Sequence, residues 1–243
     1  MNVEVTGARI LFEFLGIKIT EIQVISWAII FIIFILCIWF SNNLKVHPEN
    51  KKQIIAEYIV TTVQNFVKSN MSNNFEFFSP FILSLMILSA FSSLSSLLTF
   101  KPPTSDLNTL LGWSILVFMM IIYYKIKSMG FLGYLKSYTK PIVLLTPFNI
   151  LSDVAIPVSM AFRHFGNIVS GVVISSLVYG ALASLSSLIL GNLPGFISKV
   201  PIFELGLPAF LSIYFDLFSS LLQAFIFCML TMVYIKMAAN VEE

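Results

Sequence analysis

The longest apolar segment of this chain is too long to cross a membrane as one straight helix. It runs from about Ile142 to Leu190, about 49 residues, and a continuous helix of that length would measure about 70 Å. The hydrocarbon core of a bilayer is only about 30 Å thick. The segment must therefore tilt strongly, bend or run partly along the membrane, and Pro157 offers a position for a bend.

Four further apolar stretches approach or exceed the roughly 20 residues that a transmembrane helix needs. They are Val24 to Phe40, Phe77 to Phe100, Leu107 to Tyr124, and about Leu205 to Met237. The 243 residues are 58% hydrophobic and 11% charged, whereas soluble domains have about 45–50% and about 25%. The sequence therefore predicts an all-α integral membrane protein with five transmembrane helices, forming a single polytopic domain over residues 1–243. A net charge of +2 gives no reason to expect nucleic acid as a partner.

The segment "KKQIIAEYIVTTVQNFVKSN", residues 51–70, has apolar residues at helical spacing and charges at both ends. This pattern predicts an amphipathic helix on the membrane surface. Residues 1–75 would hold the first span and this helix, and residues 76–243 the remaining spans. With the amino terminus outside, nine lysines fall on the inner side and four basic residues on the outer side, which favours that orientation. The inner lysines are Lys45, Lys51, Lys52, Lys68, Lys125, Lys127, Lys136, Lys140 and Lys236.

The last two apolar segments are both longer than an ordinary span, and "GNLPGFISKVP" connects them with glycine and proline. They predict a long, tilted, antiparallel helical hairpin. Each half has a stripe of polar residues on one helical face, and the two stripes are expected to meet because polar groups are disfavoured against lipid. The stripes consist of Ser159, Arg163, Asn167 and Ser170 on the first half, and of Asp216, Ser219, Ser220 and Gln223 on the second.

Arg163 is the strongest functional signal. An arginine at the centre of a span costs about 2.5–3.5 kcal/mol on insertion scales, and its guanidinium stays protonated because its pKa exceeds about 12. One interpretation is a static pair with Asp216 or a helix end that fixes helix packing. The other is a fixed positive charge beside an ion pathway, with its partner supplied by another subunit.

Carboxylates are expected on both sides of the arginine. If Arg163 is level with Gln223, Asp216 lies about 10 Å toward the outside and Asp153 about 15 Å toward the inside. Asp153 could instead be a solvated residue, and Asp216 a structural hydrogen-bonding group. Asp106 and Asn108, in "PPTSDLN", lie at the outer end of the third span, where Asp106 suits both a helix cap and a pathway-lining residue.

Three motifs, in the same order, resemble the a subunit of F-type ATP synthases. They are "PPTSDLNTLLGW", "PVSMAFRHFGNIVSG" and "LLQAFIFCMLTMVYIKMA", and with the long hairpin the resemblance covers roughly residues 80–240. It implies that Arg163 faces the rotating ring of c subunits, with Gln223, Asn167 and Ser159 on the same surface. It also implies two offset aqueous half-channels. Asp216, Asp106 and Asn108 would belong to the outer one, and Asp153 to the inner one.

The chain departs from the family pattern at two positions. His164 follows the arginine where leucine is common, and Val172 stands where many members have glutamate or histidine. A lone histidine there is expected to pack or hydrogen-bond rather than to bind metal. Without the usual residue at 172, the outer pathway would depend on Asp216.

The resemblance implies a non-catalytic, ion-conducting subunit that couples proton or sodium flow to ATP synthesis or hydrolysis. Its implied partners are the c-ring, the peripheral stalk formed by subunit b, the remaining subunits of the complex and membrane lipid, with no cofactor or metal. A bacterial plasma membrane is the expected location, with an organellar inner membrane as the alternative. The rival function is a self-contained secondary transporter in which Arg163 binds an anionic substrate; it predicts internal repeats, and none is seen in the sequence.

Overall fold

Five helical segments are long and apolar enough to cross a membrane, which confirms the predicted number of spans. The computed structural model describes residues 10–14, 17–46, 50–98, 100–190, 211 and 213–239. Within them the five segments are Glu21–Ser41, Asn73–Leu98, Leu107–Ser137, Val143–Ser186 and Ile213–Ala239. The chain is therefore an all-α, multi-pass membrane protein.

The described chain begins with a short antiparallel hairpin that the sequence analysis did not predict. Strand β1 (Ile10–Phe14) pairs with β2 (Ile17–Thr20). The hydroxyl of Thr20 then accepts a hydrogen bond of 3.4 Å from the Gln23 amide. This bond satisfies one of the free amides at the start of α1 (Glu21–Ser41), so the strand leads directly into a capped helix.

The remaining helices follow in the predicted order. They are α2 (Lys51–Met71), η1 (Asn73–Phe78), α3 (Ser79–Leu94), η2 (Ser95–Leu98), η3 (Pro103–Ser105), α4 (Leu107–Ser137), η4 (Val143–Leu145), α5 (Thr146–Leu190), η7 (Ile213–Ser219) and α7 (Ser220–Ala239). Helix α4 continues beyond the predicted end at Tyr124 and is kinked at Gly130, where φ is 73° and ψ is 163°, whereas α5 runs unbroken through Pro157. The predicted connection "GNLPGFISKVP" lies outside the described residues.

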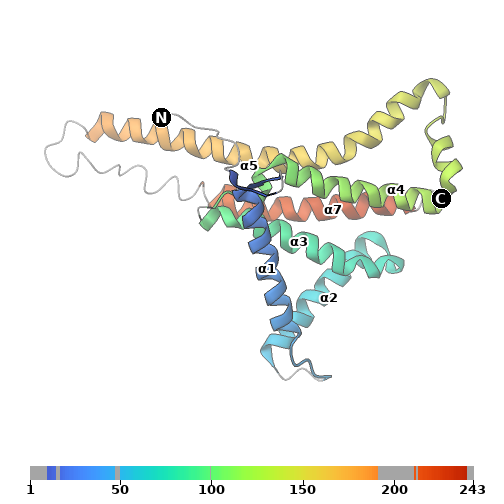
Figure 1. The fold of residues 1–243 in the computed structure, drawn as a ribbon, viewed down its shortest axis with the longest axis horizontal. Helices are drawn as coiled ribbons and strands as arrows, with labels where there is room; N and C mark the ends of the chain where they lie inside the picture. The colour runs from blue at the N-terminus through green and yellow to red at the C-terminus, as the bar shows by residue number, and fades with distance from the viewer. Residues whose placement is uncertain are drawn as a thin grey trace.

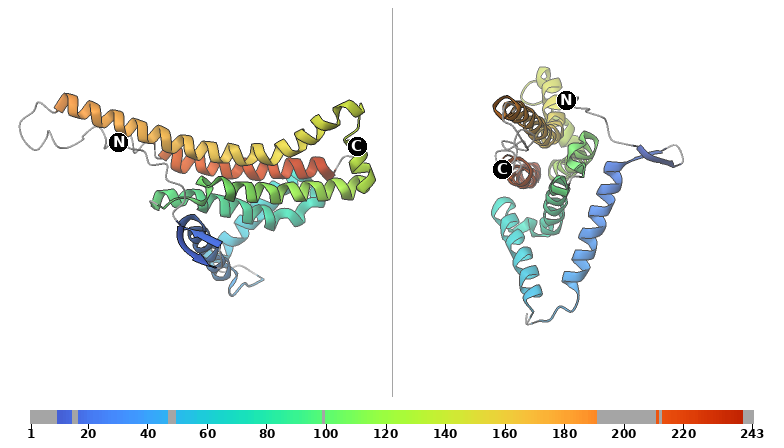
Figure 2. Two further views of the ribbon diagram at one scale, coloured as in Figure 1. Left: turned by 45° about the horizontal axis from the view of Figure 1, so that its top comes forward. Right: turned by 90° about the vertical axis from the view of Figure 1, so that its left-hand side faces the viewer.

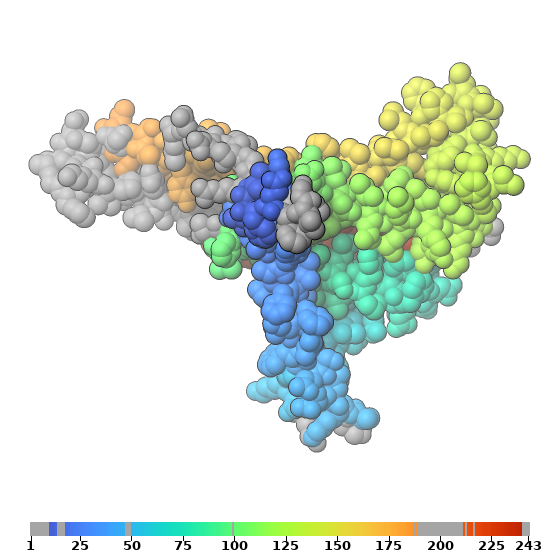
Figure 3. All heavy atoms as spheres, viewed as in Figure 1, coloured from blue at the N-terminus to red at the C-terminus, as the bar shows by residue number. Residues whose placement is uncertain are grey.

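Helix α1 stands apart from the other spans. Its 21 residues measure about 31 Å, which fits an upright crossing of a core about 30 Å thick. Helices α3, α4, α5 and α7 run alongside one another and crosswise to α1 in both views (Figures 1 and 2). An upright α1 therefore leaves α5 and α7 strongly oblique, as their length predicted. Figure 3 shows α1 projecting from the body, and only Ile22 and Ile29 on it are buried.

The predicted amphipathic helix exists as α2, but its apolar stripe is divided between two environments. Toward its end, Val63, Val67 and Met71 are buried against the helical body. Toward its start, Ile54, Ile55 and Tyr58 are 50–72% exposed. Apolar side chains that remain exposed on an amphipathic helix are suited to a membrane interface. The helix therefore has one end held by the protein core and the other available to lipid.

The protein core lies where α3, α4 and α7 pack together, with the end of α2 against them. Its side chains include Ile82, Val117, Phe227 and Met232, none more than 3% exposed. The thiol of Cys228 on α7 donates to the carbonyl of Ile82 on α3 over 3.8 Å. Helix α5 packs mainly on α4 and adds Met160 to this core, while its other flank has no partner among the described helices.

Two contacts fix the register of the antiparallel pair formed by α5 and the η7–α7 segment. The side-chain amide of Asn167 donates to the Ser219 hydroxyl over 2.6 Å. One helical turn further along α5, a Cβ built on Gly171 would lie 3.2 Å from the Phe215 Cβ. The two pairs are related by steps of four residues in opposite directions, so they define one common register. The meeting of the two polar stripes is thus seen at Asn167 and Ser219.

Helix α5 is bent in its first third, where the yellow part of the ribbon turns away from α4 (Figure 1). Pro157 lies in this region. Its ring removes one backbone amide and collides with the preceding turn, a common cause of helix bending. The bend allows the start of α5 to diverge while the rest of the helix follows α7.

His164 packs in the interior, as expected for a lone histidine here. It is 1% exposed, and its ring lies edge-on to Phe227 with centroids 6.2 Å apart. Neither ring nitrogen has a hydrogen-bond partner among the described residues. A buried polar group without a partner costs free energy that an apolar side chain of similar size would not.

We expect His164→Leu to stabilise the protein by about 1–3 kcal/mol, because it removes the unpaired imidazole. The melting temperature of the purified, detergent-solubilised chain should rise. His164→Gln is the matched control, since it keeps a polar group at the same position and should give no such gain. A lower melting temperature for His164→Leu would show that the imidazole has a hydrogen-bond partner, such as an internal water.

Gly171 offers a second test of the packing. Gly171→Leu should destabilise the hairpin by about 1–3 kcal/mol, because its side chain would have to displace Phe215. Gly180→Leu, on the same helix but with open space around its Cβ, is the control. Equal melting temperatures for the two variants would contradict the close approach of α5 to η7.

Candidate functional site

Arg163 lies in the middle of α5 with its side chain exposed on the flank that no helix covers. Among the described residues it makes no ion pair and no hydrogen bond. Phe162 and Val158 near it are 51% and 41% exposed, so the arginine stands on an apolar surface. A permanent charge on such a surface within a membrane is costly without an anionic or polar partner.

Gln223 lies opposite Arg163 in the register of the hairpin. Arg163 lies four residues before Asn167, and Gln223 lies four residues after Ser219. Because Asn167 is level with Ser219 and the two helices are antiparallel, Arg163 is level with Gln223. Gln223 is partly exposed. The position of the Asp216 and Asp153 carboxylates on opposite sides of the arginine stays a prediction.

Ser159 and Asn167 share the face of Arg163, one turn before it and one turn after it. Ser159 is exposed beside the arginine. Asn167 turns toward α7, where its amide donates to the Ser219 hydroxyl. Ser159 is thus available to a partner, while Asn167 holds the two halves of the hairpin together.

Asp216 lies in η7, a stretch of π-helix between Ile213 and Ser219. Its side chain lies outside the described residues, so the static pair with Arg163 stays a prediction. π-Helical turns are rare and are frequent at functional sites. The register places the backbone of Asp216 near that of Ser170, about 10 Å along the helix from the level of Arg163.

Asp106 is the cap of α4. Its carboxylate accepts hydrogen bonds from the Asn108 amide over 3.2 Å and from the Thr109 hydroxyl over 3.3 Å. Asn108 itself is exposed. The preceding turn, η3, packs beside both α3 and α5. A 3.1 Å hydrogen bond between the hydroxyls of Ser93 and Thr104 joins η3 to α3. The two residues at the outer end of α4 are thus held close to α5.

Asp153 is held by residues from α4 and from the turn that follows it. Its carboxylate pairs with the Lys125 ammonium, at 2.8 and 2.7 Å from the two oxygens, and accepts a 2.7 Å bond from the Tyr138 hydroxyl. The carboxylate is 16% exposed, so the residue is partnered rather than freely solvated. Ten residues separate Asp153 from Arg163, which turns it about 80° away from the arginine face.

Tyr138 strengthens this arrangement. Burial, and after it the hydrogen bond to Asp153, raise the pKa of Tyr138 well above its ordinary value. The phenol therefore remains a donor at every working pH. We call Lys125, Tyr138 and Asp153 the inner clamp. Sequence reasoning missed it, because Lys125 was used only to count charges and nothing local in the sequence pairs residues that are 28 positions apart.

The described residues bring together no group of three or more histidine, cysteine, aspartate or glutamate side chains that could hold a metal ion. What the site offers is a fixed cation on an open apolar face, a hydrogen-bonded helix pair behind it, and carboxylates at different depths on either side. Such an arrangement can attract, release or repel an ion or a mobile carboxylate.

Comparison with known proteins gives the same family as the motifs. The family model of the ATP synthase A chain matches residues 23–236. The sodium ion specific ATP synthase subunit a of Propionigenium modestum is 30% identical over 237 residues, covering 91% of this chain and 74% of that protein. ATP synthase subunit a 1 of Crocosphaera subtropica is 30% identical, with coverage of 93% and 90%.

A third relative, ATP synthase subunit a of Legionella pneumophila, is 28% identical over 237 residues and covers 97% of this chain and 94% of its own. The matches thus run through α1, the oblique helices and the site around Arg163, with no large part of the chain left out. This chain belongs to the ATP synthase A chain family.

Proposed function

We propose that this chain is the ion-translocating stator subunit of the membrane sector of an F-type ATP synthase. The observation that carries the proposal is Arg163, a permanent charge on an exposed apolar face with no partner among the described residues. In a member of the ATP synthase A chain family, a rotating ring of c subunits would supply the missing anion as a carboxylate. The named relatives are bacterial, and the protein is a multi-pass protein of the bacterial plasma membrane.

The ion follows two offset half-channels that meet only through the ring. On the outer side, Asp106, Asn108 and Asp216 line the entry, and the ion loads onto a ring carboxylate. The neutralised carboxylate then enters lipid, which a bare charge cannot do without a large cost. After nearly a full turn the carboxylate reaches the inner half-channel, next to Asp153, and releases the ion.

Arg163 separates the two half-channels. Its charge favours the ionised form of the approaching carboxylate, which promotes release of the ion. The same charge repels a cation that would otherwise pass directly from one side to the other. Gln223, Ser159 and Asn167 shape the contact surface around it. ATP chemistry belongs to partner subunits, and subunit b would hold this chain still against the ring.

The alternative of a self-contained transporter gains no support from the comparisons, since the relatives named above are ATP synthase subunits. The transported ion is a proton or sodium. Selectivity rests largely on the binding site in the ring, so both ions are to be measured in the test of the proposal.

Arg163→Ala should abolish ATP-driven ion uptake into membrane vesicles. A cation and a carboxylate about 4 Å apart attract one another by roughly 4 kcal/mol at an effective dielectric constant of about 20. Losing that attraction corresponds to about three orders of magnitude in the release equilibrium. Uptake is read with a pH-sensitive dye and with labelled sodium, on complexes shown to be fully assembled and active in ATP hydrolysis.

Ser176→Ala, further along α5 and outside the polar stripe of Arg163, is the matched control and should pump normally. Arg163→Ala vesicles should also leak the ion passively, because the electrostatic barrier is gone. Near-normal uptake by an assembled Arg163→Ala complex would overturn the stator mechanism and leave the arginine with a packing role.

The inner clamp provides a test of the inner half-channel. Asp153→Asn leaves the Lys125 ammonium without its counter-charge and should lower stability by about 1.5–3 kcal/mol, measured as a lower melting temperature. The double variant Lys125→Asp, Asp153→Lys restores the pair with its charges exchanged. If Asp153 also conducts the ion, the exchanged pair should recover stability but not uptake. Recovery of both would limit Asp153 to a structural role.

A further inference from the structure

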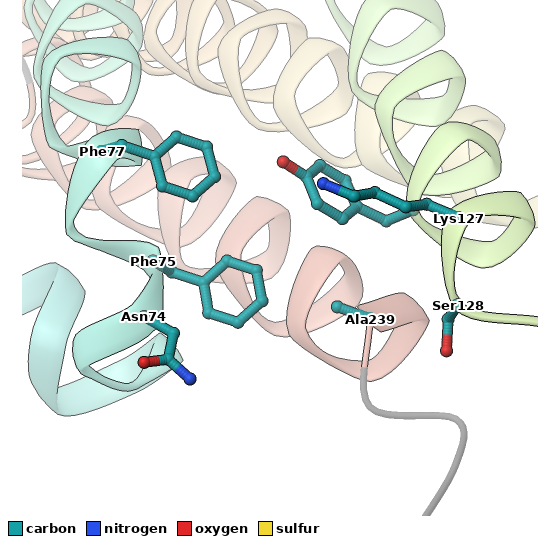
Figure 4. Close-up of a pocket in the computed structure, with 7 residues that line it drawn as sticks. Asn74, Phe75, Phe77, Lys127, Ser128 and Ala239 are labelled. Atoms are coloured by element: carbon teal, nitrogen blue, oxygen red, sulfur yellow. The ribbon is translucent and has the colours of Figure 1, made fainter.

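A hollow of about 270 Å³ lies at the inner end of the helical body, away from the Arg163 face. It is enclosed by η1, by the middle of α4 and by the last residue of α7. Figure 4 shows the rings of Phe75 and Phe77 on one side and the Lys127 side chain across from them, with Asn74 and Ser128 at the rim. Tyr124 and Ala239 complete the lining. Nothing in the proposed ion pathway uses these residues.

Lys127 gives this hollow its charge. Its ammonium lies 5.9 Å from the centre of the Tyr124 ring. Within the described part of the chain it has no carboxylate partner, whereas Lys68 pairs with Glu76 at 3.1 Å and Lys125 pairs with Asp153. An ammonium that is exposed over an aromatic ring is ready to receive an anion.

The rim of the hollow also has two hydrogen-bond donors, Asn74 on the side of η1 and Ser128 on α4 (Figure 4). The amide of Asn74 and the hydroxyl of Ser128 line the hollow and make no side-chain hydrogen bond with any other described residue. A phosphate group accepts such bonds through several oxygens. The polar rim of the hollow therefore suits an anionic group such as a phosphate.

A second hollow, of about 500 Å³, continues from the first along α4 and shares Phe77 and Tyr124 with it. Its lining is apolar and includes Leu116, Met119 and Tyr123, which are 50–61% exposed. From Lys127 back to Leu116 the helix rises about 16 Å. The apolar hollow therefore offers one acyl chain a groove of about that length beside α4.

The depth of the two hollows in the membrane agrees with a lipid. Lys127 belongs to the inner group of lysines, and Lys236, in the last turn of α7, donates to the Asn70 carbonyl on the same side. Anionic lipids concentrate in the cytoplasmic leaflet, and basic pockets between helices on that side bind their head groups. A positive rim on the inner side, continuous with an apolar groove along α4, matches one such molecule.

We propose that this double hollow is a binding site for an anionic phospholipid of the inner leaflet. The phosphate lies against Lys127, the polar part of the head group reaches the rim at Asn74 or Ser128, and one acyl chain lies along Phe77, Met119 and Leu116. The charge of the rim selects an anionic head group, since none of the described lining residues is a carboxylate that could pair with the ammonium of a zwitterionic one. The bound lipid would join η1 to α4 and close the gap between them.

The test uses the assembled complex and photoreactive phosphatidylglycerol in vesicles of phosphatidylcholine. We expect labelling within residues 74–78 and 116–128, with unlabelled phosphatidylglycerol competing and phosphatidylcholine not competing. Lys127→Ala should weaken labelling about fivefold, as expected for one lysine near the membrane surface. Lys136→Ala, an exposed lysine on the same helix but outside the hollow, is the matched control and should label like the wild type.

Equal labelling of the Lys127→Ala and Lys136→Ala complexes would overturn the proposal. So would efficient competition by inorganic phosphate, which would indicate an anion site without a lipid, or an absence of labelling in the assembled complex, which would indicate that another subunit covers the hollow. Uptake of ions by the same preparations is measured separately. It depends on Arg163 and not on this site, so the two proposals can fail independently.

Discussion

A charge that cannot be neutralised, carried on the open flank of a membrane helix, governs the organisation of this protein. Arg163 keeps its proton at any accessible pH, and the described chain provides no carboxylate for it. Its surroundings on α5 are exposed and apolar. The remaining helices hold this surface in a fixed position, where, in the proposed function, a ring of c subunits would meet it.

That position depends on contacts behind the arginine. Asn167 bonds to Ser219, and Gly171 allows the Phe215 ring to approach the backbone of α5. At the inner end, the clamp ties α5 to α4 through Asp153. Polar groups thus orient α5 from both sides of the arginine, while the apolar core of α3, α4 and α7 supplies the rigid support. A static arginine with a movable partner requires this kind of support.

Much of the architecture could be predicted from the sequence, because hydrophobic length and lysine distribution report directly on the membrane. The five spans, the surface helix and the long hairpin follow from such patterns, as does the face shared by Ser159, Arg163 and Asn167. The clamp could not be predicted in this way, since pairing Lys125 with Asp153 depends on how α4 and α5 pack. The division of α2 into a buried end and an exposed end could not be predicted either, because it also depends on how the helices pack. The β1–β2 hairpin was missed because two short strands lack a sustained pattern.

The crosswise orientation of α5 and α7 has an electrical consequence. The membrane potential falls across whatever low-dielectric material separates the two aqueous phases. Beside an upright helix that layer is about 30 Å of hydrocarbon, but water reaching both edges of an oblique helix would be separated by little more than the helix diameter of about 10–12 Å. The same voltage would then act over about a third of the distance. An oblique helix with a central arginine thus places a roughly threefold stronger electric field where the transported ion must be bound and released.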